Sequence, residues 1–395
     1  MTAESRRASI PFVDSLVQNR YWFAAFLALV LGCDATSPGS GPPLVFAQLD
    51  AGASATCGVT VDGAGYCWGD AWTSGGGGTS KPVIAPRRIA QDHQWLMIEV
   101  GRALACGLTV AHETLCWATG FPFDSAPKRV KGDPGFVTIS VGDNHACGLT
   151  ATGGAWCWGD NFRGELGLAY PDYLTAPRDS AVQPAGGQSY VALRAGPEST
   201  CGLVANGDLF CWGGSEVEGD GFTPHLVQAG FGFTTLSFGG NIAGRGRACA
   251  IAADSLSCFG YEVHSALAQP IPTTVTLPAG AAPSQATVGG IFEPLVGLPY
   301  VYALHECGVS TTGAAFCWGT NDYGQLGDST TVDRATPSMV AGLPVVAAVT
   351  AGGVHTCALT RDGTAYCWGW NGRGQLGIGS SQDHVTTPME VVSPR

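Results

Sequence analysis

The residues best equipped for chemistry in this sequence are its 15 cysteines, and fourteen of them form seven regularly spaced pairs. Two cysteines at a fixed spacing can form a disulfide, hold a metal ion, or pack as free buried thiols. Members of a pair stand ten positions apart, except in the fifth pair, where they stand nine apart. The pairs are Cys57 and Cys67, Cys106 and Cys116, Cys147 and Cys157, Cys201 and Cys211, Cys249 and Cys258, Cys307 and Cys317, and Cys357 and Cys367.

The segment around the last pair predicts a β-hairpin with one cysteine on each strand. Residues 361–363, Arg-Asp-Gly, fit a three-residue loop that ends in a left-handed glycine. Centring the hairpin on Asp362 places Cys357 opposite Cys367 at a non-hydrogen-bonded pair, where Cα atoms approach to about 4.5 Å. That separation suits a disulfide. In the fifth pair a shorter loop, residues 253–254, keeps the cysteines opposite each other, so we predict seven disulfides, each within one hairpin.

Other roles for the cysteine pairs fit the sequence less well. Zinc sites usually contain close Cys-x-x-Cys pairs, and this chain has none. Helical hairpins can also carry cysteines at this spacing, but glycines, β-branched residues and turn dipeptides between them favour strands. Free buried thiols in a reducing compartment remain the alternative to disulfides at this point.

Histidines and tryptophans recur beside the cysteines, and we expect structural roles for both. His145, His305 and His355 each stand two residues before the first cysteine of a pair. Because their repeats are not all adjacent, we expect each to fix a strand by a hydrogen bond and predict no metal site. The tryptophans beside second cysteines are expected to pack between repeats; they are Trp68, Trp117, Trp158, Trp212, Trp318 and Trp368.

No nucleophile–base group or paired-carboxylate motif recurs in the sequence, so we predict no catalytic residue and no cofactor. An enzyme with single site residues on several repeats, at a central channel, remains an alternative.

The elements that carry these residues form a unit of four short strands, and this unit repeats seven times. Each unit has a short strand ending in glycine, two cysteine strands, and a strand that starts with proline, such as Pro388–Val391. Seven such units predict an all-β fold, a seven-bladed β-propeller of four-stranded antiparallel blades over residues 46–395. The spacing leaves open whether the last strand completes the last blade or crosses to the first.

Two repeats depart from the regular spacing. The distance from the first strand's glycine to the first cysteine is ten residues in the fifth and sixth units, Gly239 to Cys249 and Gly297 to Cys307. This predicts an extra loop in those two blades. Residues 259–300, rich in proline and alanine, are expected to form an irregular insert on one face.

The N-terminus predicts export. Arg6, Arg7 and Arg20 precede an apolar run, residues 21–31, that is too short to span a membrane and suits a signal peptide over residues 1–32. The run leads into Cys33 through Leu-Val-Leu-Gly, which resembles a bacterial lipobox, and Cys33 is also the one cysteine outside the seven pairs. We therefore predict a lipid on Cys33 and a flexible tether over residues 33–45. Plain secretion after ordinary cleavage is the alternative.

Charge argues against nucleic acid as a partner. Removing residues 1–32 takes away three basic and two acidic residues, so the net charge changes from −12 to −13. Such a surface repels phosphate backbones.

Three repeats continue past the second cysteine with a shared loop, Gly-x-Asn-x-x-Gly-Gln/Glu-Leu-Gly, at residues 159–167, 319–327 and 369–377. With His355-x-Cys-Ala-Leu and the Asp-Gly turn, this resembles the repeat of the regulator of chromosome condensation family. The resemblance implies a seven-bladed propeller, in an exported bacterial member that works by binding. Nucleotide exchange on a nuclear GTPase is not carried over, because this chain has an export signal.

The predicted function is that of a monomeric protein-binding scaffold at the cell envelope, facing the periplasm or the exterior and held to the membrane by its lipid alone. The resemblance offers a secreted inhibitor of an extracellular enzyme as the alternative. Variable residues of the shared loops are the candidate protein contacts, since aromatics and arginines on loops suit recognition. They are Phe162, Arg163, Tyr323, Trp370 and Arg373.

Overall fold

A computed structural model of the chain describes residues 42–69, 83–118, 127–169, 177–214, 222–242, 245–262, 272–278, 281–293 and 301–394. The chain divides into two units, residues 1–40 and residues 41–395, and every described strand belongs to the second unit. The expected signal peptide, Cys33 and most of the tether lie outside the described residues. In the described part there is no helix of the length and hydropathy that crossing a bilayer requires.

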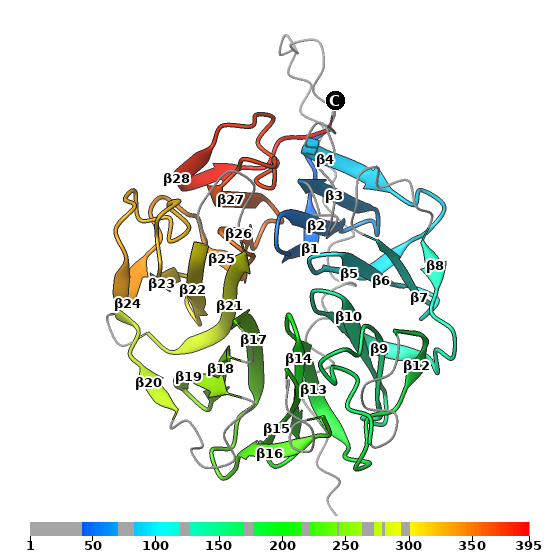
Figure 1. Ribbon diagram of the computed structural model, residues 1–395. Helices are drawn as coiled ribbons and strands as arrows, with labels where there is room; N and C mark the ends of the chain where they lie inside the picture. Colours follow the sequence, from blue (N-terminus) through cyan, green and yellow to red (C-terminus); the bar gives the residue numbers. More distant parts are fainter. Residues whose placement is uncertain are drawn as a thin grey trace, which may run out of the picture. The chain divides into compact units, whose positions relative to one another are not determined.

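Seven sheets of four antiparallel strands form the second unit, and each sheet uses four consecutive strands. They are arranged as the blades of a propeller (Figure 1), which confirms the predicted fold class. Blades 1 to 3 comprise β1 Phe46–Ala51, β2 Ala55–Thr60, β3 Gly65–Gly69 and β4 Val83–Ile89; β5 Trp95–Val100, β6 Leu104–Thr109, β7 Thr114–Ala118 and β8 Lys128–Arg129; and β9 Phe136–Val141, β10 His145–Thr150, β11 Ala155–Gly159 and β12 Arg178–Val182. Blades 4 and 5 comprise β13 Tyr190–Ala195, β14 Ser199–Val204, β15 Leu209–Gly213 and β16 His225–Gln228; and β17 Thr235–Ile242, β18 Arg245–Ala252, β19 Ser255–Glu262 and β20 Thr273–Val275. Blades 6 and 7 comprise β21 Pro283–Glu293, β22 Val301–Ser310, β23 Ala315–Gly319 and β24 Arg334–Met339; and β25 Val346–Ala351, β26 His355–Thr360, β27 Ala365–Trp370 and β28 His384–Glu390.

The two cysteines of every pair face each other across the middle hairpin of one blade. Cys357 pairs with Cys367 in the ladder, and the shortened fifth hairpin still pairs Cys249 with Cys258. All seven pairs are disulfides with Cα–Cα separations of 4.0 to 4.1 Å. Thirteen of these fourteen cysteines are at most 1% exposed, and the remaining one, Cys116, is half-buried. The disulfides are therefore part of the core, where soluble reductants cannot reach most of them.

The innermost strands meet around the propeller axis through glycines. A Cβ atom added to Gly101 would lie 1.7 Å from the carbonyl oxygen of Gly142 in the next blade. The same close approach closes the ring, since a Cβ on Gly352 of blade 7 would lie 2.3 Å from the carbonyl oxygen of Gly52. Larger residues at these positions would force the blades apart, which explains why the first strand of each repeat ends in glycine.

Blades 5 and 6 differ from the expected pattern. In the described residues of both blades the two inner strands are longer than in the other blades: β21 pairs with β22 from Pro283↔Ser310 to Glu293↔Val301. Gly289 takes the axial glycine position in blade 6, whereas Gly297 lies outside the described residues. The expected irregular insert at 259–300 is likewise interrupted by β20 and by the whole of β21. Continuing an existing ladder satisfies the backbone of inserted residues, which a loop would leave to solvent.

The ring closes without a shared strand. β28 pairs with β27 and so completes blade 7, which decides the question that the sequence left open. Blade 1 therefore meets blade 7 through contacts between their faces and edges. At this boundary the Phe46 amide donates to the Gly363 carbonyl at 2.8 Å, and the Gly353 amide donates to the Gly52 carbonyl at 3.1 Å.

Candidate functional site

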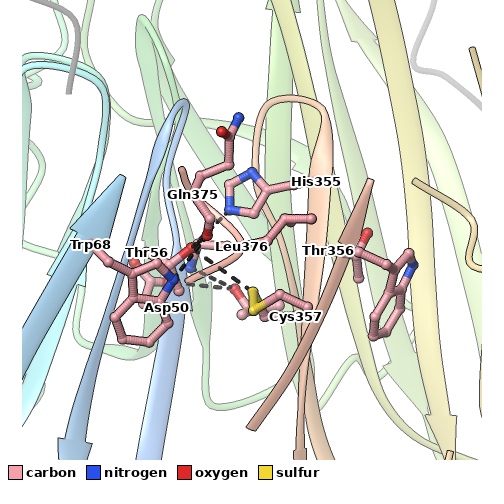
Figure 2. Close-up of a disulfide and its surroundings, with 12 residues drawn as sticks. Asp50, Thr56, Trp68, His355, Thr356, Cys357, Gln375 and Leu376 are labelled. Atoms are coloured by element: carbon pink, nitrogen blue, oxygen red, sulfur yellow. Dashed lines mark hydrogen bonds between the residues drawn. A yellow bond between two sulfur atoms is a disulfide. The ribbon is translucent and has the colours of Figure 1, made fainter. Parts of the chain in front are cut away.

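A hydrogen-bonded group, here called the clamp, joins blade 7 to blade 1 (Figure 2). The Thr56 hydroxyl donates to the Gln375 carbonyl oxygen at 2.9 Å, and the Trp68 indole N–H donates to the same oxygen at 2.9 Å. His355 Nε2 lies 2.9 Å from the Thr56 hydroxyl oxygen. Since the Thr56 proton is already donated, His355 must carry its own proton on Nε2 and donate it. Burial without a charged partner lowers the pKa of His355 to about 3, so the ring is neutral.

The clamp recurs at two other blade boundaries. His305 Nε2 lies 3.0 Å from Thr356 Oγ1, and His145 Nε2 lies 2.8 Å from Thr200 Oγ1. Trp368 and Trp212 donate to the loop carbonyls of Gln325 and Glu165, each at 2.9 Å. The histidines therefore make the expected hydrogen bonds, but their partners lie in the next blade. They are fully buried at three separate boundaries, an arrangement that cannot bring them together around one metal ion.

At the boundary between blades 5 and 6 an ion pair takes the place of the histidine and threonine. Arg247 stands two residues before Cys249, where the clamp blades have histidine, and Glu306 stands one residue before Cys307, where they have threonine. The Arg247 Nε atom binds Glu306 Oε1, and the Glu306 side chain is 3% exposed. The same geometric position is thus filled by two different pairs, and the sequence reasoning missed this one.

A histidine–threonine pair, as found in the clamps, should be able to replace the ion pair without a large loss of stability. Arg247→Ala leaves a buried carboxylate unpaired, so we expect the free energy of unfolding at pH 7.5 to fall by about 2–3 kcal/mol. The double variant Arg247→His with Glu306→Thr restores a clamp pair and should recover most of that loss. Urea unfolding of the three proteins measures this. A double variant as unstable as Arg247→Ala would show that the two pairs are not equivalent.

Glu165 is the one acidic residue at the loop position where the other clamp loops have Gln325 and Gln375. Its Oε2 accepts the Arg163 amide at 2.9 Å, as Gln375 Oε1 accepts the Arg373 amide at 3.0 Å. Burial, together with the smaller effect of the Asp160 and Glu198 charges, raises the pKa of Glu165 to about 7. The unfolded chain ionises this group near its ordinary pKa of 4.5, so its contribution to stability is full below that pH and is lost as the pH rises through 7.

Glu165→Gln should therefore stabilise the protein only at pH values at which the buried wild-type carboxyl ionises. We expect a gain of about 1–3 kcal/mol in the free energy of unfolding at pH 8 and none below about pH 4.5. Gln375→Glu is the matched reverse change and should cost stability over the same pH range. Thermal unfolding from pH 4.5 to 8 gives both curves, and a pH-independent difference would refute the assignment.

Seven side chains opposite the first cysteines form a polar belt on the innermost strands, around the propeller axis. They are Asp50, Glu99, Ser140, Arg194, Ser237, Thr287 and Thr350. Six of them accept a hydrogen bond from a backbone amide of the next blade, at 2.7 to 3.3 Å. Arg194 instead donates to its neighbour, the Leu193 carbonyl, at 2.8 Å. The belt thus ties neighbouring blades together around the axis.

Asp50 and Glu99 are the two carboxyls of the belt, and the pKa of each is raised. Burial raises the pKa of Asp50 to about 6 and, with the nearby Asp50 charge, that of Glu99 to about 7, while the Arg194 charge opposes both shifts. Both carboxyls are occupied by amide hydrogen bonds, to Val100 and Val141. The described part of the chain holds no group of three or more side chains arranged to bind a metal ion. These facts favour a structural role for the belt over acid–base chemistry.

The repeats match known protein families. Two models described as Regulator of chromosome condensation (RCC1) repeat match the chain, one at residues 136–165 and 346–375 and the other at 312–359 and 362–395. These segments fall on blades 3, 6 and 7, the blades that carry the clamp histidines and the shared loops. The chain carries RCC1 repeats. No curated protein sequence matches it.

Several solved structures are similar to this chain. Human WBSCR16 is 19% identical, with 83% of this chain and 94% of that chain covered and a TM-score of 0.63. The ectodomain of the Physcomitrella patens receptor kinase CR4 is 20% identical, with 81% and 72% covered and a TM-score of 0.48. Prp20p from Saccharomyces cerevisiae, reported with its binding properties to Gsp1p and histones, is 18% identical, with 87% and 76% covered and a TM-score of 0.44. At these identities the likeness concerns the fold alone.

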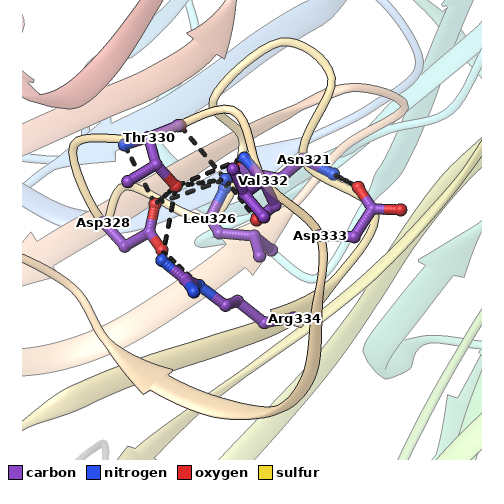
Figure 3. Close-up of polar contacts among 7 residues, drawn as sticks. All are labelled: Asn321, Leu326, Asp328, Thr330, Val332, Asp333 and Arg334. Carbon is purple, nitrogen blue, oxygen red and sulfur yellow. Dashed lines mark hydrogen bonds and ion pairs between the residues drawn. The ribbon is translucent and has the colours of Figure 1, made fainter.

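Side-chain hydrogen bonds and an ion pair hold the shared loop of blade 6. In blade 6 the Asn321 side-chain amide donates to the carbonyls of Thr330 and Val332, both at 3.1 Å, and Asp328 pairs with Arg334 at 2.7 Å (Figure 3). The loop leucines, such as Leu326, are fully buried. Loop residues that face solvent are therefore held in place before any partner arrives, which lowers the entropic cost of binding.

The structure separates the candidate protein contacts into two places. Tyr323 and Trp370 come from neighbouring blades and meet at a ring-centroid distance of 6.4 Å. Arg373 lies in the loop that follows β27, and Trp370, the last residue of β27, is only 7% exposed and can offer little of its ring to a partner. Phe162, 62% exposed, and Arg163 lie on blade 3. Their role in binding stays a prediction.

Proposed function

We propose that this RCC1-repeat propeller is an exported, lipid-anchored scaffold that binds a protein partner at the cell envelope. The observation that carries the location is the set of seven disulfides within the blades. Such bonds persist outside the reducing cytoplasm. They use fourteen of the fifteen cysteines, so Cys33 alone is left for a lipid.

Binding is favoured over catalysis by what the described side chains are engaged in. The buried histidines form hydrogen bonds with threonines of neighbouring blades, and the two belt carboxyls accept hydrogen bonds from backbone amides. In contrast, exposed apolar side chains such as Phe162 sit on preformed loops at the surface. The proposed protein works as a monomer without a cofactor or nucleic acid, and it touches the membrane only through its anchor.

Cys33→Ala tests the anchor. Cells expressing the wild-type chain should incorporate labelled palmitate into the protein and retain it in the membrane fraction. The variant should lose both the label and the membrane retention, because no other cysteine is available to a lipid. A labelled variant would remove the anchor from the proposal.

Capture from envelope extracts tests the binding role. The immobilised full propeller should retain one or more specific proteins, and a Phe162→Asp, Tyr323→Ala variant shows whether the shared loops take part. Retention of nothing beyond what a reduced, unfolded sample retains would contradict a scaffold function.

A further inference from the structure

Exposed apolar side chains gather at the end of the propeller opposite the shared RCC1 loops. Among residues with described side chains, twelve large hydrophobics are exposed, and only Phe162 and Val332 belong to loops that follow a third strand. Several others lie at the start of an innermost strand or in the turn of a cysteine hairpin, as Val45 and Val61 do. In an antiparallel four-stranded blade these two places share one end of the sheet.

Backbone contacts join the apolar residues of blades 6, 7 and 1 into one strip. The Arg361 amide donates to the Val345 carbonyl at 3.1 Å, and the Phe46 amide donates to the Gly363 carbonyl at 2.8 Å. The Val61 amide donates to the Val45 carbonyl at 2.9 Å. Met339, Val345, Val45 and Val61, here called the apolar arc, are 64%, 49%, 40% and 61% exposed.

A hollow of about 340 Å³ opens at the blade 6 end of the apolar arc. Its lining includes the apolar residues Met339, Leu343, Pro344 and Val345 together with Thr312, and it contains no titratable side chain. This volume can accept a leucine- or phenylalanine-sized side chain. A hollow of this kind beside exposed aliphatic residues is typical of an anchor site for a partner side chain.

Two carboxylates are fixed beside the apolar arc. Asp62 and Asp362 occupy the turns of blades 1 and 7, and each accepts a hydrogen bond from a threonine hydroxyl, Thr60 and Thr360. These bonds lower the pKa of both carboxyls, so both stay ionised at neutral pH. The Arg88 charge also lowers the pKa of Asp62, and the exposed Arg361 precedes Asp362 in its turn. Carboxylates at the surface attract lysine and arginine side chains of a polypeptide partner.

We propose that the apolar arc binds a polypeptide segment that places an apolar side chain in the hollow and lysine or arginine side chains against Asp62 and Asp362. This inference rests on the proposed function, and it assigns the binding to the end of the propeller that carries the cysteine hairpins. The sequence reasoning had placed the candidate contacts on the opposite loops, because it could not tell which hairpin residues would be left uncovered.

A random 12-residue peptide library displayed on phage is the probe, selected on the immobilised, oxidised chain from residue 33 onward. Enriched peptides should share an apolar residue flanked by lysine or arginine. Met339→Glu should weaken their binding at least tenfold, and Asp62→Asn with Asp362→Asn should weaken it several-fold and flatten its salt dependence. Val332→Glu, an equally exposed position on the opposite loops, is the matched control and should change the affinity less than twofold.

Other outcomes would overturn the assignment. One is that the enriched peptides lack basic residues. Another is that Met339→Glu binds the enriched peptides as well as the wild type does. A third is that the selection enriches no peptide. The proposal would also be overturned if the wild type adsorbed to phosphatidylglycerol vesicles and Met339→Glu abolished that adsorption, because the arc would then bind lipid. Capture of an envelope protein equally by the wild type and Met339→Glu would leave the proposed scaffold function standing while this inference fails.

Discussion

Reducing all seven disulfides in denaturant, and then removing the denaturant with the thiols blocked, should leave the chain unfolded. In the chain-entropy model a hairpin loop of this size contributes a little under about 3 kcal/mol, so seven loops contribute on the order of 20 kcal/mol. That sum exceeds the total stability of about 5–15 kcal/mol that is usual for a domain. Circular dichroism and near-ultraviolet spectra after dilution measure the outcome.

The controls for this experiment separate the disulfides from the treatment. The native protein should resist the same reductant without denaturant, because thirteen of the fourteen sulfur residues are at most 1% exposed. Replacing one pair, Cys147→Ala with Cys157→Ala, should lower the free energy of unfolding by only about 2–3 kcal/mol and keep the fold. A blocked chain that regains a cooperative unfolding transition would mean that packing alone suffices.

Trp68→Ala is expected to open the ring between blades 1 and 7. The Trp68 side chain is fully buried, packs against Phe46 at a centroid distance of 5.9 Å, and donates to the Gln375 carbonyl across the boundary. Its truncation leaves a cavity and removes one of the two donors to that carbonyl, which together cost about 3–5 kcal/mol. None of the described strands is shared across this boundary, so the loss should appear there first.

Trp368→Ala is the matched control, since Trp368 makes the same bond to Gln325 between blades 6 and 7. Hydrogen exchange should show faster exchange of the Phe46 and Gly379 amides in the Trp68 variant, because both donate to carbonyls across the closing boundary. The Trp368 variant should leave these amides protected. Equal protection of both amides in the two variants would contradict closure through this clamp.

The hairpins and their disulfides could be predicted from the sequence because their determinants are local. The turn glycine, the spacing and strand alternation together fix which residues face each other, and the structure pairs Cys357 with Cys367 as that reasoning required. His112 and Ala253 stand at hairpin turns in the left-handed region, with φ of 57° and 51°, so the turn conformation tolerates loss of glycine. The repeated unit of four short segments likewise predicted the four strands of each blade.

The sequence predicted that tryptophans pack between blades, but the partners of the polar contacts between blades could not be predicted, because each contact joins residues far apart in the sequence. Arg247 and Glu306 are 59 positions apart, and nothing beside either residue indicates the other. A positional signal did exist for part of the site: in five blades the belt residue stands seven positions before the first cysteine, as Asp50 does before Cys57. The longer inner strands of blades 5 and 6 break that spacing and hide Ser237 and Thr287.

Peptide mapping of the protein purified from its native host, alkylated at once and digested without reductant, tests the account most directly. We expect seven cross-linked peptide pairs, each joining two cysteines of one blade, and no alkylated cysteine among residues 46–395. Alkylated thiols at these fourteen positions in the folded protein, or links between different blades, would contradict both the stapled ring and its place outside the cytoplasm.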